Sequence, residues 1–143
     1  MIDINIYEKK WYRISPNINN FIKQVVNTIP EAHNQKISIL LTSDDHIQQL
    51  NHKYRNKNKP TNVLSFPYED FGDGTIGDVI LSLETITAEA QEANISIQEH
   101  IAHMTIHGVL HLIGYDHQEE EETLIMENLE DKIMQQLQEA KLF

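Results

Sequence analysis

Three histidines in the second half of the chain have the spacing of metal ligands. His107 and His111 are four residues apart, and on an α-helix residues at that spacing lie on one face, about 5 to 6 Å apart. Two imidazoles placed in this way can bind one metal ion. His117 follows Gly114, and glycine is the usual residue in a C-terminal cap that turns the chain sharply. We therefore predict that His117 folds back towards His107 and His111.

A fourth histidine, His103, continues the same helical stripe but fits the site less well. At about 1.5 Å rise per residue it lies roughly 12 Å from His111. Ligands of one zinc ion lie about 2.1 Å from it, so a straight helix cannot bring both residues to the ion. We expect a core or supporting role for His103. Asp116 either orients an imidazole or has a turn or capping role. The other histidines lack this spacing and are expected at the surface: His33, His46, His52 and His100.

The ligand spacing matches the H-E-x-x-H-x-x-G-x-x-H motif of metalloproteases with one difference. Gly108 follows the first histidine, where the proteases have the glutamate that acts as general base. Three neutral imidazoles leave one coordination position open for water, which is typical of catalytic zinc sites. Such a water has its pKa lowered towards neutrality and can attack a substrate without a carboxylate beside it. The alternative interpretation is that the three histidines are hydrogen-bonded core residues.

The segment that holds His107 and His111 is predicted to be a helix. Ser96 and Glu99 form the pattern of a capping box at its start. A helix would hold two of the three candidate ligands rigidly. Apolar residues recur through the segment at roughly helical spacing, at Ile97, Ile101, Met104, Val109 and Leu112.

Hydrophobic periodicity and capping residues predict the remaining elements. Strands are expected over residues 2–7, 37–41, 63–66 and 76–83. Helices are expected from Ser15-Pro16 to Val26, from Ser43 to Tyr54, over residues 84–93, and from Glu119 through Leu137. The apolar stripe of the last helix is expected at Leu124, Ile125, Leu129, Ile133 and Leu137. This order of elements predicts an α+β fold, a small and mostly four-stranded sheet packed with about five helices.

The length and composition limit the class of protein. A chain of 143 residues can bury a single core without disulfides, so we expect one domain over residues 1–143. There is no cysteine, so any metal ligands must be histidine or carboxylate. The N-terminus carries an acid where a signal peptide would have basic residues, and we expect no membrane association. We expect a soluble protein located in the cytoplasm.

The net charge of −11 argues at first against nucleic acid as a partner, because phosphate binding depends on lysine and arginine. The charge is segregated, however, and no basic residue occurs from Pro60 to Asp131. A locally positive surface beside a metal ion can accept an anionic strand, although a solvated charged loop is the alternative. The two basic stretches contain Lys53, Arg55, Lys57 and Lys59, and Lys9, Lys10 and Arg13.

Residues 107–117, His-Gly-Val-Leu-His-Leu-Ile-Gly-Tyr-Asp-His, resemble the signature of the YbeY family of metal-dependent endoribonucleases. Two further stretches agree with that family. They are Tyr54-Arg55 followed by Lys59-Pro-Thr-Asn-Val-Leu-Ser-Phe-Pro67, and Gly77-Asp78-Val-Ile. The similarity extends over about residues 35–135 in the family's order, and the N-terminal strand and helix match only in kind.

The resemblance implies that His107, His111 and His117 bind one divalent metal ion, usually zinc, and that Arg55 is the family's arginine near the active site. It implies cleavage of single-stranded RNA in maturing the 3′ end of small-subunit (16S) ribosomal RNA and in ribosome quality control. The small ribosomal subunit and its assembly factors are the implied partners. Many members have aspartate where this chain has Asn62.

The residues themselves support part of this implied function. Phosphodiester cleavage at one metal needs a nucleophile, an electrophile and a cation, and the metal can supply the first two. Arg55, with its planar guanidinium, can supply the third. Exposed bases can stack on Tyr54, Phe66 or Tyr68, although Phe66 is expected in the core. The alternatives are a non-catalytic ribosome-assembly factor with a structural metal, and a metalloprotease-like hydrolase with a different base.

Overall fold

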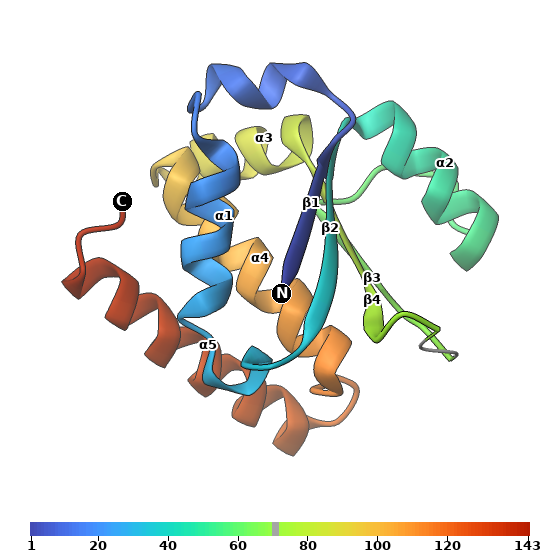
Figure 1. Ribbon diagram of the computed structural model, residues 1–143. Coiled ribbons are helices and arrows are strands. Elements are labelled where there is room, and N and C mark those ends of the chain that lie inside the picture. Colours follow the sequence, from blue (N-terminus) through green and yellow to red (C-terminus); the bar gives the residue numbers. More distant parts are fainter. Residues whose placement is uncertain (70–71) are drawn as a thin grey trace.

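The computed structural model describes residues 1–69 and 72–143, which form five α-helices, two short 3₁₀-helices (η) and one four-stranded sheet (Figure 1). Each helix in this part of the chain is too short or too polar to cross a lipid bilayer. The elements in order are β1 (Ile2–Ile6), η1 (Lys9–Arg13), α1 (Ile18–Asn27), η2 (Pro30–Ala32), β2 (Lys36–Thr42), α2 (Asp44–Arg55), β3 (Val63–Pro67), β4 (Thr75–Ser82), α3 (Leu83–Ala93), α4 (Ile97–Ile113) and α5 (Glu120–Glu139).

The sheet is mixed and has the strand order β1-β2-β4-β3. β1, β2 and β4 run parallel, and β3 pairs with β4 in the antiparallel direction. The predicted α+β fold, with a four-stranded sheet and about five helices, is therefore confirmed. β3 is an edge strand, so side chains from either face of the sheet can reach around it.

Successive side chains of a strand point to opposite faces of the sheet, and helices cover the two faces unequally. Val79 and Leu81 of β4 lie in the main core, together with apolar residues of α1, α3, α4 and α5. Ile80 of β4 and Leu64 of β3 point to the other face and contact Ile47 of α2. In Figure 1, α2 lies on one side of the strands and α4 on the other. The candidate ligands on α4 thus lie on the more deeply covered face.

α4 is the central helix of the main core, and its ends follow the expected chemistry. Ser96 accepts a hydrogen bond from the backbone N–H of Glu99 at 3.1 Å, which caps the first turn. Gly114 ends the helix with φ of +124°, a conformation that favours glycine. Nine residues of α4 are buried, so the helix cannot shift without disturbing the core. It therefore provides a rigid support for His107 and His111.

Two details of the predicted helices are wrong. α1 begins at Ile18 with Asn17 as its N-cap residue, later than the predicted start at Ser15-Pro16. Ser15 Oγ instead accepts a hydrogen bond from the N–H of Asn17 at 3.2 Å and closes the preceding turn. On α5, Leu124 and Ile125 are 58% and 52% exposed rather than buried. α5 packs mainly on α4, so only a narrow stripe of it is covered. The buried residues of that stripe are Met126, Glu130, Ile133 and Leu137.

The basic stretch at Lys9, Lys10 and Arg13 belongs to η1, which is anchored by a buried tryptophan. Trp11 is fully buried, and its Nε1 donates a hydrogen bond to the carbonyl oxygen of Thr42 at 2.9 Å. In Figure 1 this segment lies at the top of the molecule, whereas the C-terminal end of α4 lies near the bottom. Of the two basic stretches, only the one that contains Arg55 reaches the histidines.

Candidate metal centre at the end of α4

α4 and the turn after it bring the three predicted ligands together. The ring centroids of His107 and His111 are 6.4 Å apart, and their planes are nearly parallel. The ring of His117 lies 5.7 Å from that of His107 and 5.6 Å from that of His111. Three imidazoles bound to one tetrahedral zinc ion through nitrogens at about 2.1 Å would have centroids roughly 5 Å apart. The observed separations are slightly larger than this value.

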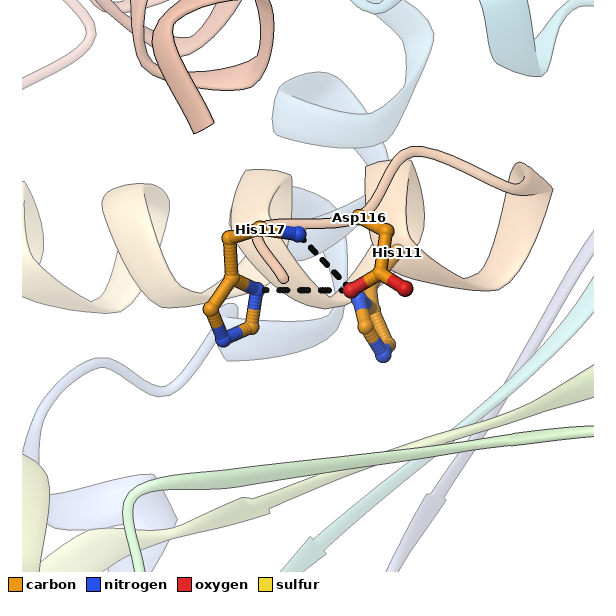
Figure 2. Close-up of side chains that lie close together, drawn as sticks. All are labelled: His111, Asp116 and His117. Carbon is orange, nitrogen blue, oxygen red and sulfur yellow. Dashed lines mark hydrogen bonds and ion pairs between the residues drawn. The ribbon is translucent and has the colours of Figure 1, made fainter. Parts of the chain in front are cut away.

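The turn that returns His117 is held by backbone bonds and by Asp116. The N–H of Gly114 donates to the carbonyl oxygen of His111 at 3.1 Å, which caps the helix. Asp116 Oδ1 accepts a hydrogen bond from the backbone N–H of His117 at 2.7 Å (Figure 2). The nearest ring nitrogen of His117 lies 3.9 Å from the same oxygen, too far for a hydrogen bond. Of the two roles expected for Asp116, the turn role is the one observed.

The most compact group of possible ligand atoms consists of His111, Asp116 and His117. One ligand atom from each lies within 4.8 Å of the others, and the group could hold a metal ion (Figure 2). His107 is not part of this group, and its Nδ1 lies 2.6 Å from a carboxylate oxygen of Glu130 on α5. Its ring is nevertheless a neighbour of the other two, so the candidate ligands are three imidazoles and one carboxylate.

The protonation state and the hydrogen bonding of His111 are compatible with a metal ligand. Burial lowers the pKa of His111, so the ring is neutral at pH 7 and keeps a lone pair. Its Nδ1 is buried and has no hydrogen-bond partner among the residues that the structure describes. Buried polar atoms are normally paired. A neutral ring with a nitrogen that the protein leaves unused, beside two further imidazoles, fits a zinc ion.

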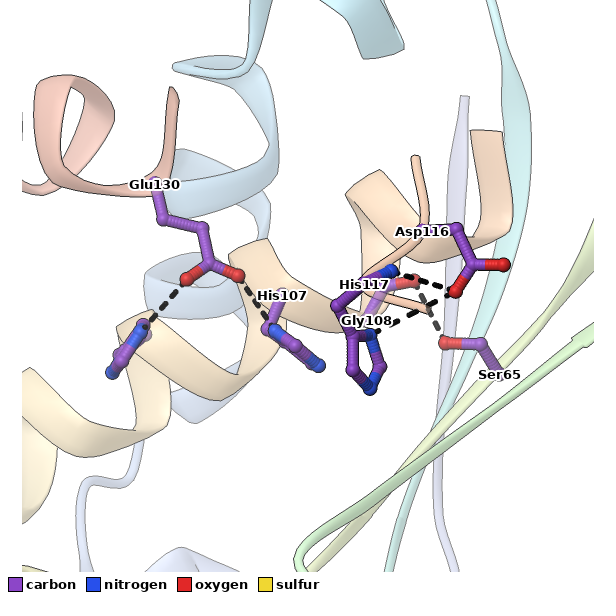
Figure 3. Close-up of polar contacts among 7 residues, drawn as sticks. Ser65, His107, Gly108, Asp116, His117 and Glu130 are labelled. Carbon is purple, nitrogen blue, oxygen red and sulfur yellow. Dashed lines mark hydrogen bonds and ion pairs between the residues drawn. The ribbon is translucent and has the colours of Figure 1, made fainter. Parts of the chain in front are cut away.

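Glu130 of α5 is hydrogen-bonded to two histidines of α4, one of which is a candidate metal ligand. It is only 5% exposed and accepts hydrogen bonds from His107 Nδ1 at 2.6 Å and from His103 Nε2 at 3.2 Å (Figure 3). Burial alone would raise the pKa of Glu130, but the bonds and charges of the two histidines outweigh it and lower the pKa to about 2. An ionised carboxylate only accepts, so both imidazoles donate an N–H to it. In the neutral form of His107 that donates from Nδ1, the other ring nitrogen has the lone pair that a metal ion needs.

The sequence interpretation missed Glu130, although a signal for it was present. The residue lies four positions after Met126 and three before Ile133, so it falls on the buried stripe of α5. An acid at such a position requires a partner, because an unpaired buried charge is very costly. The expected stripe correctly included Ile133 and Leu137, but in the first half of α5 it named Leu124 and Ile125 instead of Met126 and Glu130. His103 has the supporting role that was expected, through this carboxylate, and its hydrogen bond to Glu130 raises its pKa.

We expect Glu130→Gln to weaken metal binding by about 10- to 100-fold. This is the usual effect of replacing a residue that hydrogen-bonds to a metal ligand, here His107. The amide has the same shape, but it lacks the charge that fixes the orientation and tautomer of His107. Competition with a chromophoric chelator would measure the affinity. Glu121→Gln, an exposed change on the same helix, is the control. Equal affinity in both variants would show that Glu130 does not act on the site.

Arg55 reaches the candidate site from the other face of the sheet. It is the last residue of α2, and its Nη2 donates a hydrogen bond to the carbonyl oxygen of Ser65 on the edge strand at 3.0 Å. Its guanidinium carbon lies 5.4 Å from the ring centroid of Phe66. Arg55 lines a pocket of about 200 Å³ together with Asn62, Val63, Ser65 and the three histidines. A fixed positive charge therefore borders the site.

Asn62 lines the same pocket and is bound to a carboxylate. Its Nδ2 donates hydrogen bonds to both carboxylate oxygens of Glu89, at 3.0 and 3.2 Å. Glu89 Oε1 is also 2.9 Å from Nε2 of His100, whose side chain is only 12% exposed. The expected surface position of His100 is therefore wrong: its side chain is largely covered and is paired with the partly exposed Glu89.

The other three histidines lie outside the site. His33 and His52 are exposed, as expected. His46 is half-buried, which the sequence interpretation did not predict, and its Nδ1 lies 2.7 Å from the hydroxyl of Thr42. Burial lowers the pKa of His46.

Packing explains the glycine that stands where metalloproteases have glutamate. A Cβ atom at Gly108 would lie 2.6 Å from Val79 Cγ1 and 2.9 Å from Val63 Cγ2. The carbonyl oxygen of Gly108 accepts a hydrogen bond from Ser65 Oγ at 2.7 Å (Figure 3). A glutamate here would point into the sheet instead of towards the histidines. This position therefore cannot supply a peptidase base.

We expect Gly108→Ala to lower the free energy of unfolding by about 1 to 3 kcal/mol, the usual cost of overpacking a core. The added methyl group would push α4 away from β3 and β4. Thermal unfolding followed by circular dichroism would measure the change. Gly72→Ala is the control, because a Cβ there meets no atom within 4 Å. Equal melting temperatures of the two variants would contradict the close packing of α4 on the sheet.

The chain is similar to known proteins over almost its whole length. Residues 3–138 match the family model described as Endoribonuclease YbeY. A protein named Endoribonuclease YbeY from Wolbachia sp. subsp. Drosophila simulans is 47% identical over 143 residues, covering 96% of this chain and 95% of the relative. The protein of that name from Ehrlichia canis is 43% identical, covering 96% and 93%. A solution structure of a Thermotoga maritima protein shares the fold, with a TM-score of 0.61 and 24% identity over 99% of this chain and 95% of that one.

Proposed function

We propose, since the chain belongs to the YbeY family of endoribonucleases, that it is a metal-dependent endoribonuclease that cleaves single-stranded RNA. The observation that carries the proposal is the convergence of three imidazoles beside the guanidinium of Arg55. The proposed substrate in the cell is ribosomal RNA, with roles in maturing the 3′ end of 16S RNA and in ribosome quality control. The small ribosomal subunit and its assembly factors are the proposed partners, in the cytoplasm.

The proposed ligands of one divalent ion, zinc being favoured, are His107, His111 and His117. When bound, the ion would lower the pKa of a water molecule and polarise a phosphoryl oxygen. Imidazole is preferred here to the carboxylate of Asp116, because Asp116 is already bonded to the backbone in its own turn. His107 keeps one nitrogen free while Glu130 holds the other. Asp116 remains close enough to be a fourth ligand.

The protein's own groups have defined parts in the proposed reaction. Glu130 accepts the Nδ1 proton of His107 and so fixes the tautomer and the direction of that ring. Arg55 binds the phosphate that is cut and meets the negative charge that develops on it. The carbonyl oxygen of Ser65 holds the guanidinium in place before the substrate arrives. We treat residues 1–143 as one catalytic domain, because one core joins helices from both ends of the chain.

The decisive test compares cleavage of a labelled single-stranded RNA with cleavage of the same sequence in a duplex. Metal-quantified protein should cut the single strand, lose activity with a chelator and regain it with zinc. A sample that cuts neither RNA but binds the small ribosomal subunit would favour an assembly factor with a structural metal. Cleavage of unstructured peptides instead of RNA would favour a protease-like hydrolase, which the packing at Gly108 argues against.

A further inference from the structure

A hollow of about 510 Å³ lies on the face of the sheet opposite the histidines, between α2 and strands β3 and β4. Its apolar base is formed by strand residues that contact α2 on the less covered face of the sheet, among them Leu40 and Ile80. Pockets of this size and character are typical of sites for small organic groups. Six residues that give the hollow its chemistry are His46, Leu50, Tyr54, Phe66, Tyr68 and Asp78.

The walls of the hollow offer aromatic rings to the solvent. Tyr54 is 59% exposed and Tyr68 is 37% exposed, although both have large apolar rings. The ring of Tyr54 lies 5.5 Å from that of Phe66, which is half-buried beneath it. Aromatic side chains in such an arrangement are suited to stack on flat π systems, and the nucleobases of single strands are bound in this way.

Polar groups lie at the rim of the same hollow. The hydroxyl of Tyr68 donates a hydrogen bond to Asp78 Oδ1 at 2.7 Å, and a carboxylate oxygen can accept further hydrogen bonds. The Nδ1 of His46 is paired with Thr42, so its Nε2 is available for a ligand. A base that stacks on the aromatic rings would find hydrogen-bonding groups along its edge. The lining thus combines a stacking surface with a few polar contacts.

Arg55 connects the hollow with the candidate metal site. α2 covers the face of the sheet that carries the hollow, and Tyr54 and Arg55 are its last two residues. Arg55 packs on Phe66, which lines the hollow, and also lines the pocket of the three histidines across the edge strand. One strand of nucleic acid could therefore contact both places by bending over the edge of β3.

The charge of this edge is complementary to a phosphate backbone. Lys53 Nζ lies 5.1 Å from the ring centroid of Tyr54, and Lys57 and Lys59 are exposed in the segment that leads from α2 to β3. These lysines and Arg55 form one of the two basic stretches of an acidic chain. Lysine and arginine are the residues that contact nucleic-acid phosphates. The charge therefore favours an RNA strand over an acidic or purely apolar partner.

We propose that the hollow binds a nucleobase of the RNA substrate, while the phosphate to be cut lies at the three histidines. The strand would pass over β3 with Arg55 between the two positions. This inference rests on the proposed function and adds a physical reason for a single-strand preference. The bases of a duplex are paired and stacked inside the helix, so none of them can enter the hollow.

Photo-crosslinking tests the position of the base directly. A set of eight-nucleotide RNAs, each with one 5-iodouridine at a different position, would be irradiated with the full-length protein in the presence of a chelator, so that the strand binds without being cut. Mass spectrometry would locate the crosslinks. We expect at least one RNA to crosslink to Tyr54, Phe66 or Tyr68. Crosslinks found only elsewhere, or none at all, would overturn the proposal.

Kinetics of a variant provide the second readout. Tyr54→Ala should raise KM for an eight-nucleotide RNA by about 10-fold or more, the effect of losing one stacked base, with kcat within about 2-fold. Tyr54→Phe keeps the ring and should restore KM. Leu124→Ala, an equally exposed apolar change on α5, should leave both constants unaltered.

The outcomes separate this proposal from the proposed function. RNA cleavage by the unchanged protein, together with an unaltered KM in Tyr54→Ala, would refute the base site and leave the nuclease intact. A protein that cuts no RNA would refute the nuclease, and the crosslinks would still decide whether the hollow binds a base. A hollow that serves a partner protein would give neither crosslinks nor a change in KM, which overturns the proposal.

Discussion

Replacing His111 with alanine is expected to abolish metal binding and RNA cleavage together. His111 is the middle ligand of the proposed set, and its neutral ring has a nitrogen that the protein does not use. Removing a residue that hydrogen-bonds to a metal ligand lowers metal affinity by about 10- to 100-fold. Removing a ligand itself should lower the metal affinity further. Metal content after gel filtration and competition with a chelator would measure the loss. Cleavage of labelled RNA should fall to the background of the assay.

Two controls are needed for the His111→Ala experiment. One shows that the variant is still folded, and the other shows that the cleavage does not come from a contaminating ribonuclease. His111 is only partly buried, so the variant should keep the circular dichroism spectrum of the unchanged protein. His52→Ala removes an exposed histidine from α2 and should retain metal and activity when purified in the same way. Unaltered metal content in His111→Ala would exclude this residue as a ligand. Equal cleavage by both variants would point to a contaminant.

Arg55→Ala is expected to keep the fold and the metal while reducing cleavage by about 10²- to 10³-fold, the range found for removing one preorganised group that stabilises transition-state charge. The guanidinium is held beside the histidines by the carbonyl oxygen of Ser65 and by the ring of Phe66. It is therefore positioned before the substrate binds. The measured quantity is kcat/KM for a short single-stranded RNA, at one fixed salt concentration because phosphate contacts depend on salt.

Two further variants distinguish a specific role of Arg55 from a general effect of charge. Lys57→Ala removes one positive charge from the same exposed stretch and should reduce cleavage only slightly, mainly through KM. Arg55→Lys keeps the charge but loses the planar fork that binds two oxygens at once, so it should recover only part of the activity. An Arg55→Ala enzyme that cuts RNA at the normal rate would remove Arg55 from the mechanism.

The sequence alone was sufficient for features that depend on residues close together in the chain. The cap at Ser96, the i, i+4 spacing of His107 and His111 and the turn at Gly114 all appear as predicted. Helix caps and helix faces arise from contacts within about four residues. Strand periodicity and the order of elements were likewise enough to predict an α+β fold with four strands and five helices.

Only the tertiary structure showed which distant residues meet. Glu130 contacts His107 because α5 packs on α4, and Arg55 reaches the same site because β3 is the edge strand next to α2. The exposure of Leu124 and the covered side chain of His100 have the same origin, namely which surfaces are covered by which neighbours. Sheet order and helix packing place residues side by side that are far apart in the chain. Residue spacing along α5 can mark Glu130 as a buried acid, but it does not identify His107 as its partner. That contact and the hollow behind the sheet could be found only in the folded molecule.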